Sequence, residues 1–180
     1  MIIGVDLGNK SRNAIVVMDN GILLDWSRLN YKDSKNTWEH RKKIVKQIKE
    51  YIKKYNLTKN DYLLFEQIFF SRGFSTMSNV TSMAFLQATL INEFSNKINI
   101  VEVHVQSWKS KVLGSRSATK EDSVAFVEKY YPEIDLNIEI KKRKGIEIIK
   151  DNDTADAVCI ALYPKFVDKK KLDDNLVNYT

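Results

Sequence analysis

Residues 1–8 of the chain read MIIGVDLG, an apolar run that a single acid, Asp6, interrupts near its end. The run predicts a buried β-strand, in which an unpaired carboxylate is costly. Two further segments carry the same apparent fault. Glu66 follows the apolar run YLLF, and Asp153 and Asp156 open the stretch DTADAVCIAL. The economical explanation is that the three segments meet and that divalent cations neutralise their acids.

Strands and one tight turn dominate the first 30 residues. Residues 1–7 and 12–18 read as strands, Asp19-Asn20-Gly21 is a hairpin turn signal, and ILLDWSRLNY continues from the turn as a third strand. Hydrophobic periodicity then predicts helices at about 37–55, 79–94, 107–113, 119–130 and 153–163, and strands at 61–66 and 99–105. Residues 133–150 read as irregular or weakly extended. The pattern predicts an α/β fold, in which helices flank a mixed five-stranded sheet of three antiparallel strands followed by parallel strands.

The composition indicates a single domain without a membrane span. The 180 residues are 43% hydrophobic, and no apolar stretch is long enough to cross a bilayer. We expect residues 1–164 to form the domain and the charged residues 165–180 to be a frayed tail. The N-terminus lacks the features of a signal peptide, and the lone Cys159 reads as a buried thiol, so the sequence predicts a reducing, cytoplasmic setting. Both histidines, His40 and His104, read as ordinary surface or strand residues.

Topology explains how the acids could converge. A central first strand with the fourth strand parallel beside it places Asp6 close to Glu66. Asp153 and Asp156 are three residues apart and share one face of a helix. Asp153 has an alternative explanation as a helix N-cap, but Asp156 lies among apolar residues and has none. Several carboxylates suit Mg²⁺ or Mn²⁺ better than zinc, and two such ions ~4 Å apart are a common device for cutting a phosphodiester.

The charge balance points to a polyanionic partner. The formal net charge is +6 even though four acids belong to the proposed cluster, so the remaining surface is more basic than the total suggests. Four consecutive cations precede the last predicted helix and could bind phosphates, namely Lys141, Lys142, Arg143 and Lys144. The lysines of the predicted helix 37–55 are better explained as its solvated face.

Four segments in order resemble the RuvC-type Holliday junction resolvases of the ribonuclease H-like superfamily, as found in bacteria and their phages. They are IIGVDLG, LLFEQIFF, SWKSKVLGSRSATK and DNDTADAVCIAL. The resemblance spans nearly the whole chain. It implies a homodimeric, metal-dependent endonuclease of DNA recombination and repair that resolves four-way junctions, and other branched DNA, by paired nicks. Its place of action would be the cytoplasm of a bacterial cell or a phage-infected host.

The resemblance also assigns roles to residues. It implies that two Mg²⁺ or Mn²⁺ ions are held by the acidic tetrad Asp6, Glu66, Asp153 and Asp156. Lys120 would lie near the scissile phosphate, where it stabilises developing negative charge. Phe69 would stack on an unpaired base at the crossover, whereas the residues alone leave open which of Phe69 and Phe70 belongs to the core. Lys109 is a candidate phosphate contact that Lys111 and Arg116 could assist.

Three other functions remain open at this level. An actin-like ATP-binding domain also begins with a strand and D-x-G, but it needs two lobes and more glycine than the six residues present here. A ribonuclease H-like nuclease could instead cut RNA–DNA hybrids or flaps, because the same metal chemistry cuts any phosphodiester. A DNA-binding module without activity is the third alternative, and the complete set of four acids argues against it.

Overall fold

A computed structural model gives the fold of residues 1–8, 12–68, 77–142 and 145–177. Its strands are β1 (Ile2–Asp6), β2 (Arg12–Asp19), β3 (Ile22–Asn30), β4 (Tyr62–Glu66), β5 (Asn99–Val103), β6 (Asn137–Lys142) and β7 (Gly145–Lys150). Its α-helices are α1 (Thr37–Lys54), α2 (Met77–Phe94), α3 (Val105–Val112), α4 (Lys120–Tyr130), α5 (Asn152–Leu162) and α6 (Lys169–Asp173). Short 3-10 helices cover Tyr31–Asp33 and Tyr163–Phe166. None of the helices within these ranges has the length and hydrophobicity of a membrane span.

The main sheet confirms the predicted fold class. Its strand order is β3-β2-β1-β4-β5, with β1 antiparallel to β2 and parallel to β4. The hairpin between β2 and β3 turns through Asn20 and Gly21, which have φ angles of 50° and 83°. Both residues tolerate positive φ, which explains why this dipeptide signals the turn.

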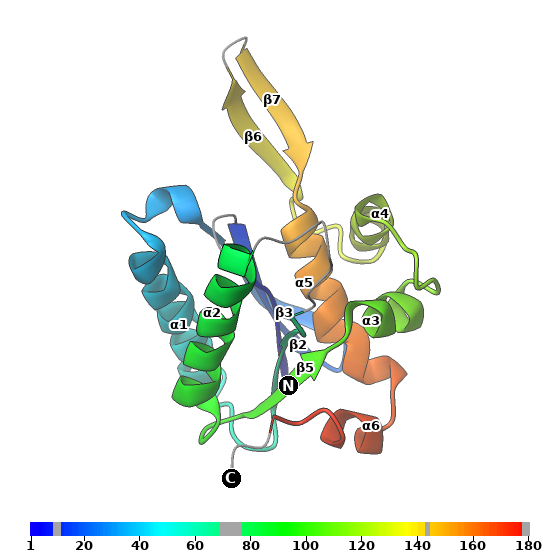
Figure 1. Cartoon of the computed structure of the whole chain (residues 1–180). Helices are drawn as coiled ribbons and strands as arrows, with labels where there is room; N and C mark the ends of the chain where they lie inside the picture. The colour runs from blue at the N-terminus through cyan, green and yellow to red at the C-terminus, as the bar shows by residue number, and fades with distance from the viewer. Residues whose placement is uncertain (9–11, 69–76, 143–144, 178–180) are drawn as a thin grey trace.

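Helices cover both faces of the sheet and divide the core in two (Figure 1). On one face, α1 and α2 pack against Ile3, Val5 and Phe65. On the other face, α5 packs against Leu64 and Val101 together with residues of α3 and α4. Cys159 of α5 is fully buried, as expected for a structural thiol.

Two segments differ from the sequence-based expectation. Residues 137–142 and 145–150 pair as the two antiparallel strands of a β-hairpin, whereas we expected residues 133–150 to be irregular or weakly extended. Residues 172–177 pack against the sheet edge at β5, whereas we expected residues 165–180 to fray. Leu172 is buried, Leu176 bridges Val101, and the Val177 N–H donates to Ile100 O at 2.9 Å. Apolar residues among the lysines of this segment cover β5.

Candidate metal centre

The ends of two neighbouring strands bring the first two acids together. Val5 of β1 pairs with Phe65 of β4, so Asp6 and Glu66 leave adjacent parallel strands side by side. Side chains alternate along a strand, so Glu66 shares the face of Leu64, which packs under α5. Asp6 shares the face of Gly4, which also lies under α5. Both carboxylates therefore lie on the α5 side of the sheet.

Gly4 allows α5 to pack directly on the strand that carries Asp6. A Cβ at Gly4 would lie 2.6 Å from Ala157 O and 2.6 Å from Ala161 N. Asp153 lies one helical turn before Ala157, and Asp6 lies two residues beyond Gly4 toward the same end of the sheet. This close approach thus brings the first turn of α5 next to Asp6.

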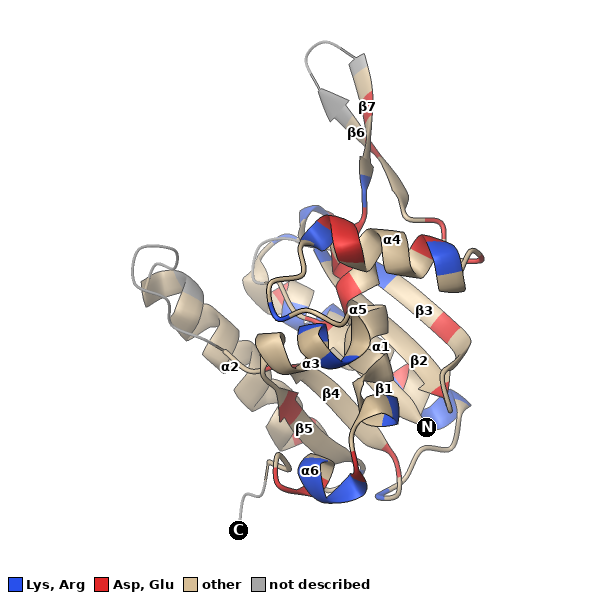
Figure 2. Ribbon diagram, turned by 90° about the vertical axis from the view of Figure 1, so that its right-hand side faces the viewer, with Lys and Arg blue, Asp and Glu red and all other residues tan. Residues whose placement is uncertain are grey.

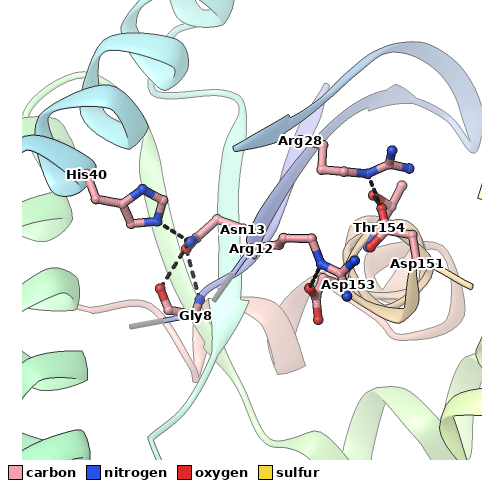
Figure 3. Close-up of polar contacts among 8 residues, drawn as sticks. All are labelled: Gly8, Arg12, Asn13, Arg28, His40, Asp151, Asp153 and Thr154. Atoms are coloured by element: carbon pink, nitrogen blue, oxygen red, sulfur yellow. Dashed lines mark hydrogen bonds and ion pairs between the residues drawn. The ribbon is translucent and has the colours of Figure 1, made fainter. Parts of the chain in front are cut away.

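The N-terminus of α5 is fixed by Asp151, and not by Asp153 as its position had suggested (Figure 3). The fully buried Asp151 is the N-cap, whose Oδ1 accepts the Thr154 N–H at 3.4 Å. Its other carboxylate oxygen accepts hydrogen bonds from the Thr154 hydroxyl and from Arg28 Nε. Because Asp151 caps the helix, the capping explanation for Asp153 is excluded.

Glu66 and Asp153 each have a hydrogen-bond donor from a distant part of the chain. Trp108 Nε1 donates to Glu66 Oε1 at 2.7 Å. Arg12 Nε lies 3.2 Å from Asp153 Oδ2, as Figure 3 shows. The Trp108 ring is fully buried, so it fixes the orientation of Glu66. Neither contact was predicted from the sequence, because Trp108 lies 42 positions from Glu66 and Arg12 lies 141 positions from Asp153.

The four carboxylates influence one another electrostatically. Burial is the largest cause that raises the pKa of Asp6 well above its ordinary value. The charges of Glu66, Asp156 and Asp153 raise this pKa further, in that order. Burial is also the main cause of the raised pKa values of Glu66, Asp153 and Asp156. The positive charge of Lys120 offsets part of the rise in each of the four pKa values, so it acts on the whole cluster.

The donor set fits a hard divalent cation. Asp156 Oδ1 is buried and has no hydrogen-bond partner in the described structure, which leaves a carboxylate oxygen for a ligand. As the side chains stand, no group of three or more His, Cys, Asp or Glu residues among those described is close enough together to hold a metal ion. Carboxylates repel one another, and a bound cation removes this repulsion.

The predicted basic residues occupy different places. Lys109 is close to the cluster, since its charge lowers the pKa values of Glu66 and Asp156, and its Nζ donates to Ala118 O at 2.6 Å. Lys111 and Arg116 instead line a hollow of about 310 Å³ beside α3. Lys141 and Lys142 end β6. Phe69, Arg143 and Lys144 lie outside the described residues.

A second buried network holds Gly8, two residues after Asp6. The Asn13 side chain accepts the Gly8 N–H at 2.9 Å and donates to Gly8 O at 3.0 Å. It also lies 2.7 Å from Nε2 of His40, a buried residue of α1 rather than the surface residue we expected (Figure 3). Burial lowers the pKa of His40, so the neutral ring accepts a hydrogen bond from Asn13. His104 caps α3, where its Nδ1 accepts the Gln106 N–H.

Solved structures with the same architecture include RuvC proteins. The chain is similar to RuvC from Thermus thermophilus, with 16% identity and a TM-score of 0.62 over 97% of each chain. It is also similar to T. thermophilus RuvC in complex with Holliday junction substrate, with 17% identity and a TM-score of 0.64 over 97% of this chain and 96% of the other. No curated protein matches the chain. At these identities the likeness shows the fold.

The fold is therefore the ribonuclease H-like α/β architecture of the RuvC structures. The chain belongs to the family described as Lactococcus phage M3 protein (DUF3882), whose model matches residues 17–166. The matched span contains Glu66, Lys120, Asp153 and Asp156, and it begins after Asp6.

Proposed function

We propose that this protein is a metal-dependent endonuclease that cuts branched DNA, above all four-way junctions, in the cytoplasm of a bacterial or phage-infected cell. The observation that carries the proposal is the electrostatic coupling of Asp6 to three other carboxylates, which come from the C-terminal end of β4 and from the first turns of α5. The RuvC architecture, seen elsewhere with a Holliday junction, supports the choice of DNA substrate.

Asp6, Glu66, Asp153 and Asp156 would hold the metal. Two Mg²⁺ or Mn²⁺ ions would supply an activated water and would stabilise the departing 3′ oxygen. The water oxygen forms a bond to phosphorus as the P–O3′ bond breaks, which leaves a 5′ phosphate and a 3′ hydroxyl that a ligase can rejoin. Trp108 orients Glu66 by its 2.7 Å hydrogen bond, so this ligand is positioned before the substrate arrives.

Lysine and arginine side chains of the chain would bind the phosphates of the DNA. Lys120 begins α4, where a positive charge is unfavourable to the helix dipole, and its charge acts on all four carboxylates. We assign Lys120 to the scissile phosphate, where it stabilises charge in the transition state. Lys109 and, farther out, Lys111 and Arg116 would contact the backbone of the DNA, with Lys141, Lys142, Arg143 and Lys144 on a neighbouring arm. Phe69 stays the proposed base-stacking residue.

The test is a cleavage assay on end-labelled four-way, three-way and linear duplex DNA and on an RNA–DNA hybrid. We expect paired nicks in the four-way junction with Mg²⁺, weaker cutting of three-way DNA, and no cutting in EDTA, because four carboxylates without metal cannot activate water. Preferential cutting of the hybrid would instead identify a ribonuclease. Cutting that persists in EDTA would contradict the metal mechanism.

A second copy of the chain would pack on α2. Within this 18-residue helix Glu93 is the one charged residue, and Figure 2 shows its ribbon almost entirely uncharged. Met77 and Phe85 are 71% and 61% exposed, and Ala84 and Ala88, on either side of Phe85 in the sequence, are exposed as well. An uncharged, apolar helix face suits the core of a symmetric interface. Such a dimer presents two sites, as paired nicks require.

Ala84→Arg should therefore convert a dimer to a monomer. The change places a long cation in the middle of the proposed interface, while the isolated chain loses no buried contact. Light scattering after size exclusion should give twice the 20.9 kDa chain mass for the wild type and the single chain mass for the variant. Ala125→Arg, at an exposed position of α4, is the matched control and should remain dimeric. A dimeric Ala84→Arg protein would exclude this face.

A further inference from the structure

The β6–β7 hairpin stands away from the body of the protein (Figure 1). Its two strands form a sheet of their own and pair with each other from Asn137↔Lys150 to Lys142↔Gly145. A two-stranded hairpin has little stability of its own in water. Its sequence therefore has to be explained by something other than the core of this domain.

Large apolar side chains are exposed on this hairpin. Ile146 and Ile148 of β7 are 63% and 65% exposed, and their spacing of two residues places them on the same face of the ribbon. Glu139 is the cross-strand neighbour of Ile148, and Lys141 is the neighbour of Ile146. Two adjacent exposed isoleucines on a projecting ribbon indicate a contact surface.

The base of the hairpin is tied to the metal centre. The Asp151 N–H donates to Leu136 O at 2.7 Å, and Arg28 donates both to the Asp151 carboxylate and to Asp135 O. Lys150 donates to Asn137 Oδ1 at 2.9 Å, which closes the two strands at their base. The residue that caps α5 thus also anchors the hairpin, only two positions before Asp153. DNA bound at the carboxylates would pass beside this ribbon.

The positive charge of the hairpin segment favours nucleic acid as its partner. Residues 137–150 contain five Lys or Arg and two Glu, and four of these cations are consecutive at the end of β6 and beyond it. A β-ribbon fits a groove of DNA, and isoleucine is among the side chains that proteins insert between base steps. A segment that is rich in cations and carries exposed isoleucines has the chemistry to hold phosphates and to cover a base that has lost its stacking partner.

We propose that the β6–β7 hairpin is a branch-sensing element in which Ile146 and Ile148 pack against unstacked bases next to the cut site. This inference rests on the proposed DNA function and adds a specificity surface that is separate from the carboxylates. Duplex DNA, whose bases are stacked, offers the isoleucines no such face. The hairpin therefore favours branched DNA over linear DNA.

The test compares Ile146→Ser/Ile148→Ser with the wild type on four-way junctions that carry 2-aminopurine at or near the branch point, in Ca²⁺ without Mg²⁺. Wild-type protein should increase the fluorescence, because unstacking relieves quenching of this base. The double variant should lose most of the increase and bind the junction about tenfold more weakly, as the loss of one or two base contacts predicts. Its affinity for linear duplex should be unchanged.

Ile22→Ser is the matched control, since Ile22 is 67% exposed at the start of β3 and lies outside the hairpin. It should behave as the wild type, and all variants should melt at the same temperature because the changed side chains are exposed. An unaltered fluorescence increase and junction affinity in the double variant would overturn the inference. A change in its oligomeric mass would also overturn it, because the isoleucines would then contact a second copy. Wild-type protein that cuts no branched DNA in Mg²⁺ would refute the proposed function instead.

Discussion

Asp6→Asn protein should bind a four-way junction like the wild type and cut it at least about a thousandfold more slowly, the scale expected when a metal ligand of a hydrolase is lost. Asp6 is central to the cluster, because the charges of all three other acids raise its pKa. Asparagine keeps the shape of the side chain but removes the charge that a cation needs. Glu66→Gln should give the same result, since Glu66 is the proposed ligand at the end of the neighbouring strand β4.

Single-turnover cleavage in Mg²⁺ and gel-shift titration in Ca²⁺ separate the two effects. Asp174→Asn, an exposed acid beyond α6, controls for the loss of one negative charge and should cut at the wild-type rate. If Asp6→Asn folds and no longer binds the junction, the carboxylate serves DNA binding and the metal assignment fails.

Asp6→Asn should also be more stable toward unfolding than the wild type in EDTA at pH 8. A carboxyl group whose pKa is higher in the folded than in the unfolded protein binds more protons in the folded state. The metal-free wild type therefore loses stability as the pH rises from ~4, the unfolded pKa of aspartate, through the raised folded pKa of Asp6. Asparagine removes this loss. Each kcal/mol regained should raise the melting temperature by about 2–4 °C for a chain of this size. Near pH 3, where the carboxyl is protonated in both states, the difference should disappear.

Much of the sheet could be predicted because its signals are local. The Asn20–Gly21 turn and the apolar runs on either side predict β2 and β3 without any knowledge of the core. The acids were visible for a related reason, since each of them stands out against its own neighbours in sequence. Asp6 and Glu66 were then expected to lie close together, because neighbouring parallel strands have their C-terminal ends side by side. The structure confirms that β1 and β4 are such neighbours.

Features that depend on distant partners could not be predicted. Asp151 and Asp153 are equally plausible caps in sequence, and Arg28, 123 positions away, stabilises Asp151 in the buried capping position. The indole of Trp108 reads as an apolar helix residue until its N–H is seen to donate to Glu66. The β6–β7 hairpin is different, because its alternation of isoleucine with charged residues was a readable strand signal that the cluster of cations obscured.

Gly4→Ala should destabilise the fold by about 2–3 kcal/mol, the usual cost of forcing a methyl group into a packed interior. The new Cβ would meet backbone atoms of α5 at 2.6 Å, and backbone cannot rotate away as a flexible side chain can. Thermal and urea unfolding followed by circular dichroism should show a melting temperature lower by roughly 4–12 °C. An unchanged melting curve would mean that α5 has room to move.

Two further variants separate packing from backbone conformation. Gly114→Ala has no atom within 4 Å of the new Cβ but a φ of +78°, so its smaller cost of about 1 kcal/mol should come from strain alone. Adding Ala161→Gly to Gly4→Ala removes the Cβ contact at 2.7 Å but not the contacts with Ala157 O and Ala161 N, so rescue should be partial.

Because α5 carries Asp153 and Asp156, its displacement also moves these proposed ligands away from Asp6. Gly4→Ala should therefore lose Mg²⁺-dependent cleavage well below its melting temperature, whereas Gly114→Ala should keep it.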